Sequence, residues 1–97
     1  MNKSELFAHI LDVVSRETEV SSEDILSESK AVEIVDARSL LAVSLYEAGF
    51  YPPVIARYMK KTPACIRYLI AGFEQRKNSN KILEISSQNI RKMLKNN

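Results

Sequence analysis

The strongest structural signals in this sequence lie between Gly49 and Pro63, where the chain is marked three times for the end or the start of a helix. Gly49 follows a long apolar periodic segment, and glycine most readily takes the left-handed conformation that ends a helix. Proline fits the first turn of a helix, because its missing N–H is not needed there. A short helix is therefore expected to begin near Pro53, and Thr62 is expected to cap another that begins at Pro63. A long helix, a short helix and a further helix should follow one another closely.

The rest of the chain repeats apolar residues at three- and four-residue steps, and no alternating run is long enough to indicate a sheet. Ser4 is the expected N-cap of the first helix, and Ser86-Ser87 is expected to weaken or bend the last one. The expected helices cover residues 4–18, 22–26, 31–48, 53–59, 63–77 and a last stretch from about 81. The pattern predicts one all-α domain over residues 1–97, a compact bundle of five to six helices that contains a helix-turn-helix.

Charge is divided unevenly along the chain. Residues 1–56 carry ten acidic and four basic side chains, and residues 57–97 carry ten basic and two acidic ones, so the formal balances are −6 and +8. This asymmetry suggests a polyanion as the partner of the basic part. A solvated basic face without a partner is the alternative, and charge alone does not distinguish the two.

The basic part contains the segment that the helix signals mark as a helix-turn-helix. In that motif the second helix places its N-terminal residues in the major groove of DNA, and the first helix crosses the backbone. The expected DNA-contacting residues from this segment are Arg57, Lys60, Lys61, Thr62, Arg67 and Tyr68. Arg67 can bond a guanine edge or hold a phosphate, and Tyr68 can instead serve as a packing residue. Ile66 and Leu69 are expected to face the core.

The order of these segments resembles the C-terminal, origin-binding domain of the bacterial chromosomal replication initiator DnaA, a member of the Trp-repressor-like helix-turn-helix group. The resemblance extends from about Glu5 to Leu94 and depends on the order and spacing of several short runs. The runs are Val20-Ser21-Ser22-Glu23-Asp24-Ile25-Leu26, Val35-Asp36-Ala37-Arg38-Ser39-Leu40-Leu41-Ala42, Tyr46-Glu47-Ala48-Gly49, Ile55-Ala56-Arg57-Tyr58-Met59 and Thr62-Pro63-Ala64-Cys65-Ile66. The resemblance implies binding to double-stranded DNA, and it implies that Arg38 contacts DNA from the start of the long helix.

The chain departs from the family at two places. Thr62-Pro63-Ala64-Cys65 stands where the family has Asp-His-Thr-Thr, which removes most of the base-reading groups, and the loop of residues 28–33 has lost most of the family's positive charge. Phosphate contacts are therefore expected to dominate. The family's ATPase module is missing from the sequence, so the resemblance implies neither ATP binding nor origin melting.

The residue patterns that enzymes and metal sites need are not found in the sequence. Cys65 is the only cysteine and His9 the only histidine, and no nucleophile elbow, glycine-rich phosphate loop or dinucleotide fingerprint occurs. We therefore expect no enzyme activity, no catalytic or metal-binding residues, no cofactor and no small-molecule substrate. The polar start and the short apolar runs predict neither a signal peptide nor a membrane span, so a cytoplasmic, nucleoid-associated protein is expected.

A second hypothesis is a protein–protein interaction module that keeps the fold and has lost specific DNA binding. In this hypothesis the acidic face of residues 17–36 docks a basic partner protein. A dimer would need an exposed apolar stripe, and the candidate is the last helix, through Ile82, Ile85, Ile90 and Met93.

Overall fold

A computed structural model describes residues 1–95 of the chain, and this part is all helical, with no strand. The all-α fold predicted from the apolar spacing is thus confirmed. The helices are α1 (Lys3–Thr18), α2 (Ser22–Ile25), α3 (Val32–Glu47), α4 (Pro52–Met59), α5 (Pro63–Asn78) and α6 (Lys81–Lys95). They share one hydrophobic core.

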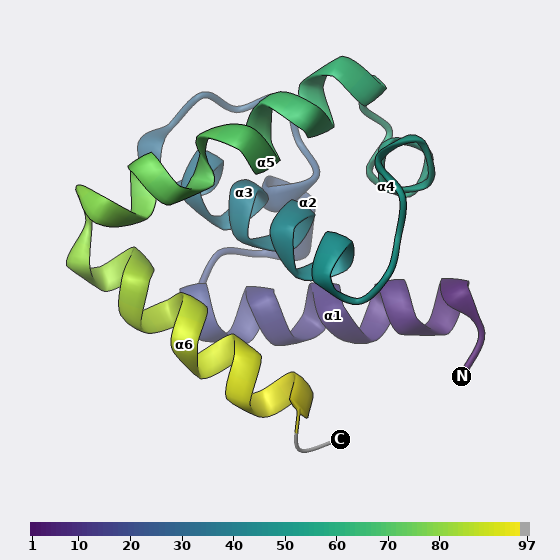
Figure 1. The fold of residues 1–97 in the computed structure, drawn as a ribbon, viewed down its shortest axis with the longest axis horizontal. Coiled ribbons are helices and arrows are strands. Elements are labelled where there is room, and N and C mark those ends of the chain that lie inside the picture. Colours follow the sequence, from purple (N-terminus) through teal and green to yellow (C-terminus); the bar gives the residue numbers. More distant parts are fainter. Residues whose placement is uncertain (96–97) are drawn as a thin grey trace.

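Helix α3 is the central element, and each of the other five helices packs against it. Figure 1 shows α5 above α3, α1 and α6 below it, and α4 at its C-terminal side. Half of its residues are buried, and small side chains such as Ala37, Ala42 and Ser44 let the neighbouring helices approach closely. The two ends are exposed: Val32 lies in the first turn and Ala48 follows the last one.

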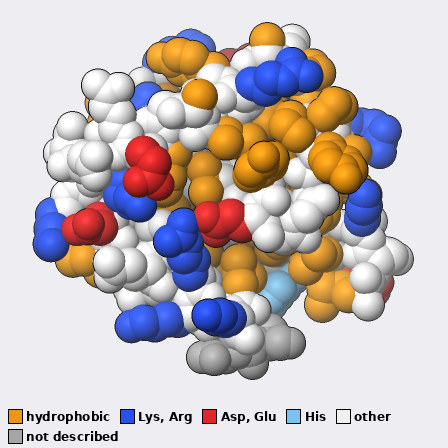
Figure 2. All heavy atoms as spheres, viewed as in Figure 1, with side chains coloured by type: hydrophobic (Ala, Val, Ile, Leu, Met, Phe, Trp, Pro, Cys, Tyr) orange, Lys and Arg blue, Asp and Glu red, His pale blue; other side chains and the backbone are white. Residues whose placement is uncertain are grey.

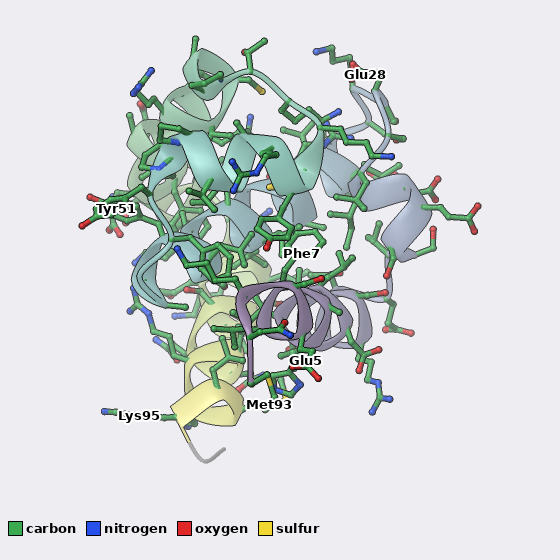
Figure 3. All side chains as sticks on the ribbon, turned by 90° about the vertical axis from the view of Figure 1, so that its right-hand side faces the viewer. Glu5, Phe7, Glu28, Tyr51, Met93 and Lys95 are labelled. Carbon is green, nitrogen blue, oxygen red and sulfur yellow. The ribbon has the colours of Figure 1, made fainter. Side chains whose placement is uncertain are left out.

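Aromatic side chains fix α4 against α1. The rings of Phe7 and Tyr58 are stacked with their centroids 5.1 Å apart, and Phe50 meets Tyr58 edge-on at 5.9 Å. Figure 3 shows Phe7 rising from α1 toward α4. Ile55 and Met59 are buried beside these rings, so α4 is held by aromatic packing and by the core.

The helices begin where side chains can accept hydrogen bonds from the first backbone N–H groups. Thr62 Oγ1 accepts from the N–H of Cys65 at 3.1 Å, and Pro63 is the first residue of α5, as predicted. The expected cap of α1 at Ser4 is wrong: Asn2 Oδ1 accepts from the N–H of Glu5 at 2.8 Å, and Glu5 Oε1 accepts from the N–H of Asn2 at 3.0 Å. Asn2 takes the cap because this reciprocal pair satisfies two backbone donors at once.

Helix α3 ends at a left-handed glycine. Gly49 has φ +102°, its N–H donates to the carbonyl of Tyr46, and the N–H of Phe50 donates to the carbonyl of Leu45. These two bonds form the Schellman motif, which satisfies carbonyls at the helix end and turns the chain toward α4. Phe50 completes the motif by packing into the core.

Helix α6 continues through Ser86 and Ser87, so the expected bend at these residues is wrong. Both serines are buried. Their small side chains fit where α6 meets α1 and α3, and tertiary packing outweighs the weak helix propensity of serine.

The two glycines should respond in opposite directions to alanine. Gly49→Ala places a Cβ on a backbone with φ +102° and should lower the free energy of unfolding by about 1–2 kcal/mol. Gly72 lies inside α5 and a Cβ there meets open space, so Gly72→Ala should raise the free energy of unfolding by about 0.5–1 kcal/mol. Urea denaturation followed by circular dichroism measures both changes. Equal effects of the two substitutions would contradict this account of the α3 terminus.

Candidate nucleic-acid interface

Helices α4 and α5 form the helix-turn-helix that the sequence predicts. Three residues join them: Lys60 takes a left-handed conformation at φ 57°, Lys61 donates its N–H to the carbonyl of Ala56, and Thr62 caps α5. Ile66 and Leu69 are buried on the inner side of α5, as expected. The start of α5 is therefore set at a fixed angle to α4 by packing and by its cap.

The outer face of α5 is exposed along the whole helix. The side chains on this face are Ala64, Arg67, Tyr68, Ala71, Glu74, Gln75 and Asn78. In Figure 1 α5 crosses the top of the molecule, and no other helix lies over it. The first carboxylate of α5 is Glu74, which is held by Lys77 at 3.1 Å, so the N-terminal two turns present no negative side chain.

Three exposed cations surround the start of this face. Arg57 on α4, Lys60 in the turn and Arg67 on α5 make no ion pair within residues 1–95. Figure 2 shows basic side chains over α4 and the start of α5, whereas the acidic side chains that stand out in this view lie at the left and near the centre. The positive charge at this end of the motif is thus not neutralised by neighbouring carboxylates.

Arg38 was expected to contact DNA, but its side chain is 5% exposed and is used inside the fold. Its Nε donates to the carbonyl of Ile25 at 2.8 Å, and Nη1 donates to the carbonyl of Ser29 at 2.9 Å. Nη2 donates to the carbonyls of Ser27 at 2.7 Å and Asp24 at 3.3 Å. The end of the short helix α2 leaves carbonyls without partners, and the arginine fork supplies the donors.

Lys61 is also turned inward. Its Nζ donates to the carbonyl of Ser27 at 2.8 Å and to Glu28 Oε1 at 2.7 Å, which leaves 9% of its side chain exposed. The hydrogen bond and the charge of Lys61 lower the pKa of Glu28 below its ordinary value of 4.5. Arg38 and Lys61 together hold the segment from Asp24 to Ser29, and neither ammonium nor guanidinium faces outward.

A groove of about 730 Å³ lies between this segment and the start of α5. Its lining includes the predicted residues Arg38, Lys60, Lys61, Thr62 and Tyr68. It also includes Lys30 and Arg76, which the sequence reasoning missed; Arg76 pairs with Asp36 at 2.9 Å. Arg38, Lys61 and Arg76 are bonded within the fold, so the groove can meet an anion with Lys30 and Lys60. Arg57 and Arg67 lie outside it, on the exposed sides of α4 and α5.

Gln75 and Asn78 are further candidate contacts that the sequence reasoning missed. Both lie on the outer face of α5 at helical spacing from Ala71, so the periodicity that identified Arg67 and Tyr68 also marks them. Amide side chains can bond base edges or phosphates.

The remaining hollows and clusters do not converge on a second site. The hollow of about 790 Å³ between α1, α3 and α6 is larger than the basic groove, but its Arg91 and Glu47 are bonded to each other at 2.7 Å. Within residues 1–95, no group of three metal-ligating side chains gathers. The helices of that part are also too short or too polar to cross a bilayer.

Arg38 should be a stability residue and Arg57 should not. Arg38→Lys cannot reproduce the planar fork and leaves buried carbonyls without donors, so the free energy of unfolding should fall by about 2–3 kcal/mol. Arg57→Lys changes an exposed side chain and should stay within about 0.5 kcal/mol of wild type. Urea unfolding of the two variants tests this. If Arg38→Lys unfolds like wild type, the internal role of Arg38 is refuted.

Comparisons with protein-family models, with characterised proteins and with solved structures found no match to this chain. What the surface of α4 and α5 can bind is therefore inferred from its own side chains: exposed cations, an uncovered helix face and an adjoining basic groove.

Proposed function

We propose that the protein binds double-stranded DNA through α4, the turn and α5, with the start of α5 in the major groove. The observation that carries the proposal is the uncovered face of α5 in a motif whose exposed cations, Arg57, Lys60 and Arg67, make no ion pair within residues 1–95. An exposed helix with basic residues at its leading end matches the electrostatic and steric needs of a duplex groove.

The exposed residues divide into phosphate-binding and base-facing groups. Arg57 and Lys60 lie beside the leading end of α5, where the positive helix terminus also favours phosphate. Ala64 and Ala71 add little bulk, so the backbone of α5 can approach base edges closely. Arg67 and Tyr68 project between these alanines; the guanidinium can bond guanine or a phosphate, and the phenol can donate a hydrogen bond.

The contact set proposed here differs from the one expected from the sequence. Arg38 and Lys61 are left out because their donors are occupied by carbonyls of residues 24–29. Lys30 is added, since it lines the groove and makes no ion pair within the described part of the chain. Thr62 stays close to the surface but uses its hydroxyl oxygen as the cap of α5.

The relationship to the origin-binding domain of the initiator DnaA belongs to the same proposal. The helix order fits it, with a long central helix before the helix-turn-helix, and a role in replication initiation or in transcriptional regulation within the nucleoid would follow. Internal use of Arg38 departs from the contact that the resemblance implies.

The salt dependence of DNA binding tests the proposal. If Lys30, Arg57, Lys60 and Arg67 neutralise about four phosphates, the logarithm of the binding constant should fall with the logarithm of salt concentration at a slope near −3.6. Lys60→Gln/Arg67→Gln removes two of these contacts and should reduce the slope by about 2. Fluorescence anisotropy with a labelled duplex, begun at low salt, measures both slopes.

Lys3→Gln/Arg16→Gln is the matched control, because it removes the same charge from exposed positions on α1. Its slope should equal that of wild type. If both double variants weaken binding equally, the protein responds only to net charge and α5 is not the contact surface. If wild type does not bind at low salt, the proposed function is excluded.

A further inference from the structure

The outer face of α6 carries large apolar side chains in contact with solvent. Ile82 is 77% exposed, Ile85 46% and Met93 37%, and with Asn89 they lie on one side of the helix. We name these four residues the α6 stripe. Ile90, which the sequence analysis placed on the exposed stripe, is 1% exposed and belongs to the core. The exposed stripe therefore includes Asn89 in place of Ile90. Exposed aliphatic residues clustered in this way mark an interaction surface.

The two ends of the α6 stripe have opposite charge. Around its N-terminal end, Ile82 shares a hollow of about 340 Å³ with the exposed Val32 and with the carboxylates of Glu17, Glu19 and Glu33. Lys81, beside Ile82, is offset by Glu84 at 3.0 Å, so the carboxylates of the hollow set the charge of this end. At its C-terminal end, α6 carries Lys92 and Lys95, both exposed and neither in an ion pair within residues 1–95. Asn89 lies between the two ends and donates to Glu17 Oε2 at 3.0 Å.

We propose that the α6 stripe is the contact between two copies of this chain, packed with their α6 helices antiparallel about a two-fold axis near Asn89. A two-fold contact uses the same surface on both copies, so it must be complementary to itself. Antiparallel packing sets Ile82 and Ile85 of one copy near Met93 of the other. It also places the lysines of each copy opposite the carboxylates of its partner, twice in each dimer.

The charge pattern favours a second copy over another protein. A partner of uniform charge would be attracted to one end of the α6 stripe and repelled at the other. A second copy packed antiparallel brings opposite charges together at both ends. The stripe offers three exposed apolar side chains, whereas obligate dimers bury about 2,000 Å² or more, so we expect the contact to be reversible.

Dimer formation leaves the helix-turn-helix uncovered. In Figure 3 Glu28, beside the basic groove, lies at the top of the molecule, and Met93 and Lys95 lie at the bottom. Each dimer would therefore present two α5 faces, which on the proposed function could occupy two half-sites on DNA.

The molar mass of wild type in the absence of DNA, measured by sedimentation equilibrium from about 1 µM to 1 mM, tests this inference. We expect the mass to rise from 11.0 kDa toward twice that value. Ile82→Lys removes the most exposed apolar side chain and sets a cation against the lysines of the partner, so the dimer dissociation constant should rise at least tenfold, about 1.4 kcal/mol or more. Tyr51→Lys makes the same kind of change at a side chain that is 73% exposed before α4, away from α6, and should leave the constant unchanged.

Charge exchange tests the antiparallel order. Glu19→Lys and Lys92→Glu should each weaken the dimer, and the two together should restore it, because opposite charges again face each other across the axis. A wild-type chain that stays monomeric at every concentration would overturn the inference, as would equal effects of Ile82→Lys and Tyr51→Lys. Failure of the charge rescue would refute the antiparallel arrangement. DNA binding by a monomer is unaffected by any of these outcomes.

Discussion

The enclosure of α3 is the constraint on which the rest of the structure depends. Because the five other helices pack around it, α3 buries residues on nearly every side, and its close contacts require alanine and serine as well as leucine. Ile66, Leu69 and Phe73 of α5 point toward this centre. Once these residues are buried, the opposite side of α5 has to face solvent. The surface that we propose for DNA is thus a direct consequence of how α3 is covered.

Two buried cations, Arg38 and Lys61, fix the loop that follows α2. Arg38 extends from α3 and Lys61 from the turn before α5, and both donate to carbonyls that follow α2. The loop after α2 has little apolar material of its own, so these charge-assisted hydrogen bonds fix it beside α5. The bonds also define one wall of the basic groove. Two residues that look like DNA contacts in the sequence therefore shape the surface without belonging to it.

Local signals made most of the fold predictable, and distant partners account for what was missed. The left-handed Gly49, the Thr62 cap and the first residue of α5 depend on neighbours within a few positions, so the sequence shows them directly. The burial of Arg38 depends on carbonyls 9 to 14 residues away, and that of Lys61 on a carbonyl 34 residues away. Charge and helix phase alone cannot reveal such pairs. The orientation of α6 about its own axis was predicted incorrectly for a similar reason. Apolar residues at three- and four-residue steps lie on more than one side of α6, and packing against α1 and α3 buries Ile90 and leaves Ile82 exposed.

The same distant pairs decide where charge remains at the surface. The formal excess of positive charge after residue 56 is partly cancelled in the folded chain, where Lys61 meets Glu28, Arg76 meets Asp36 and Arg91 meets Glu47. These bridges link the basic part of the sequence to the acidic part, and each one offsets a positive charge with a carboxylate. Among residues 57–95, the cations without an ion pair are Arg57, Lys60 and Arg67 in the helix-turn-helix and Lys92 and Lys95 at the end of α6. A polyanion can approach the first group while carboxylates of another copy approach the second, because the helices that carry the two groups lie on opposite sides of α3.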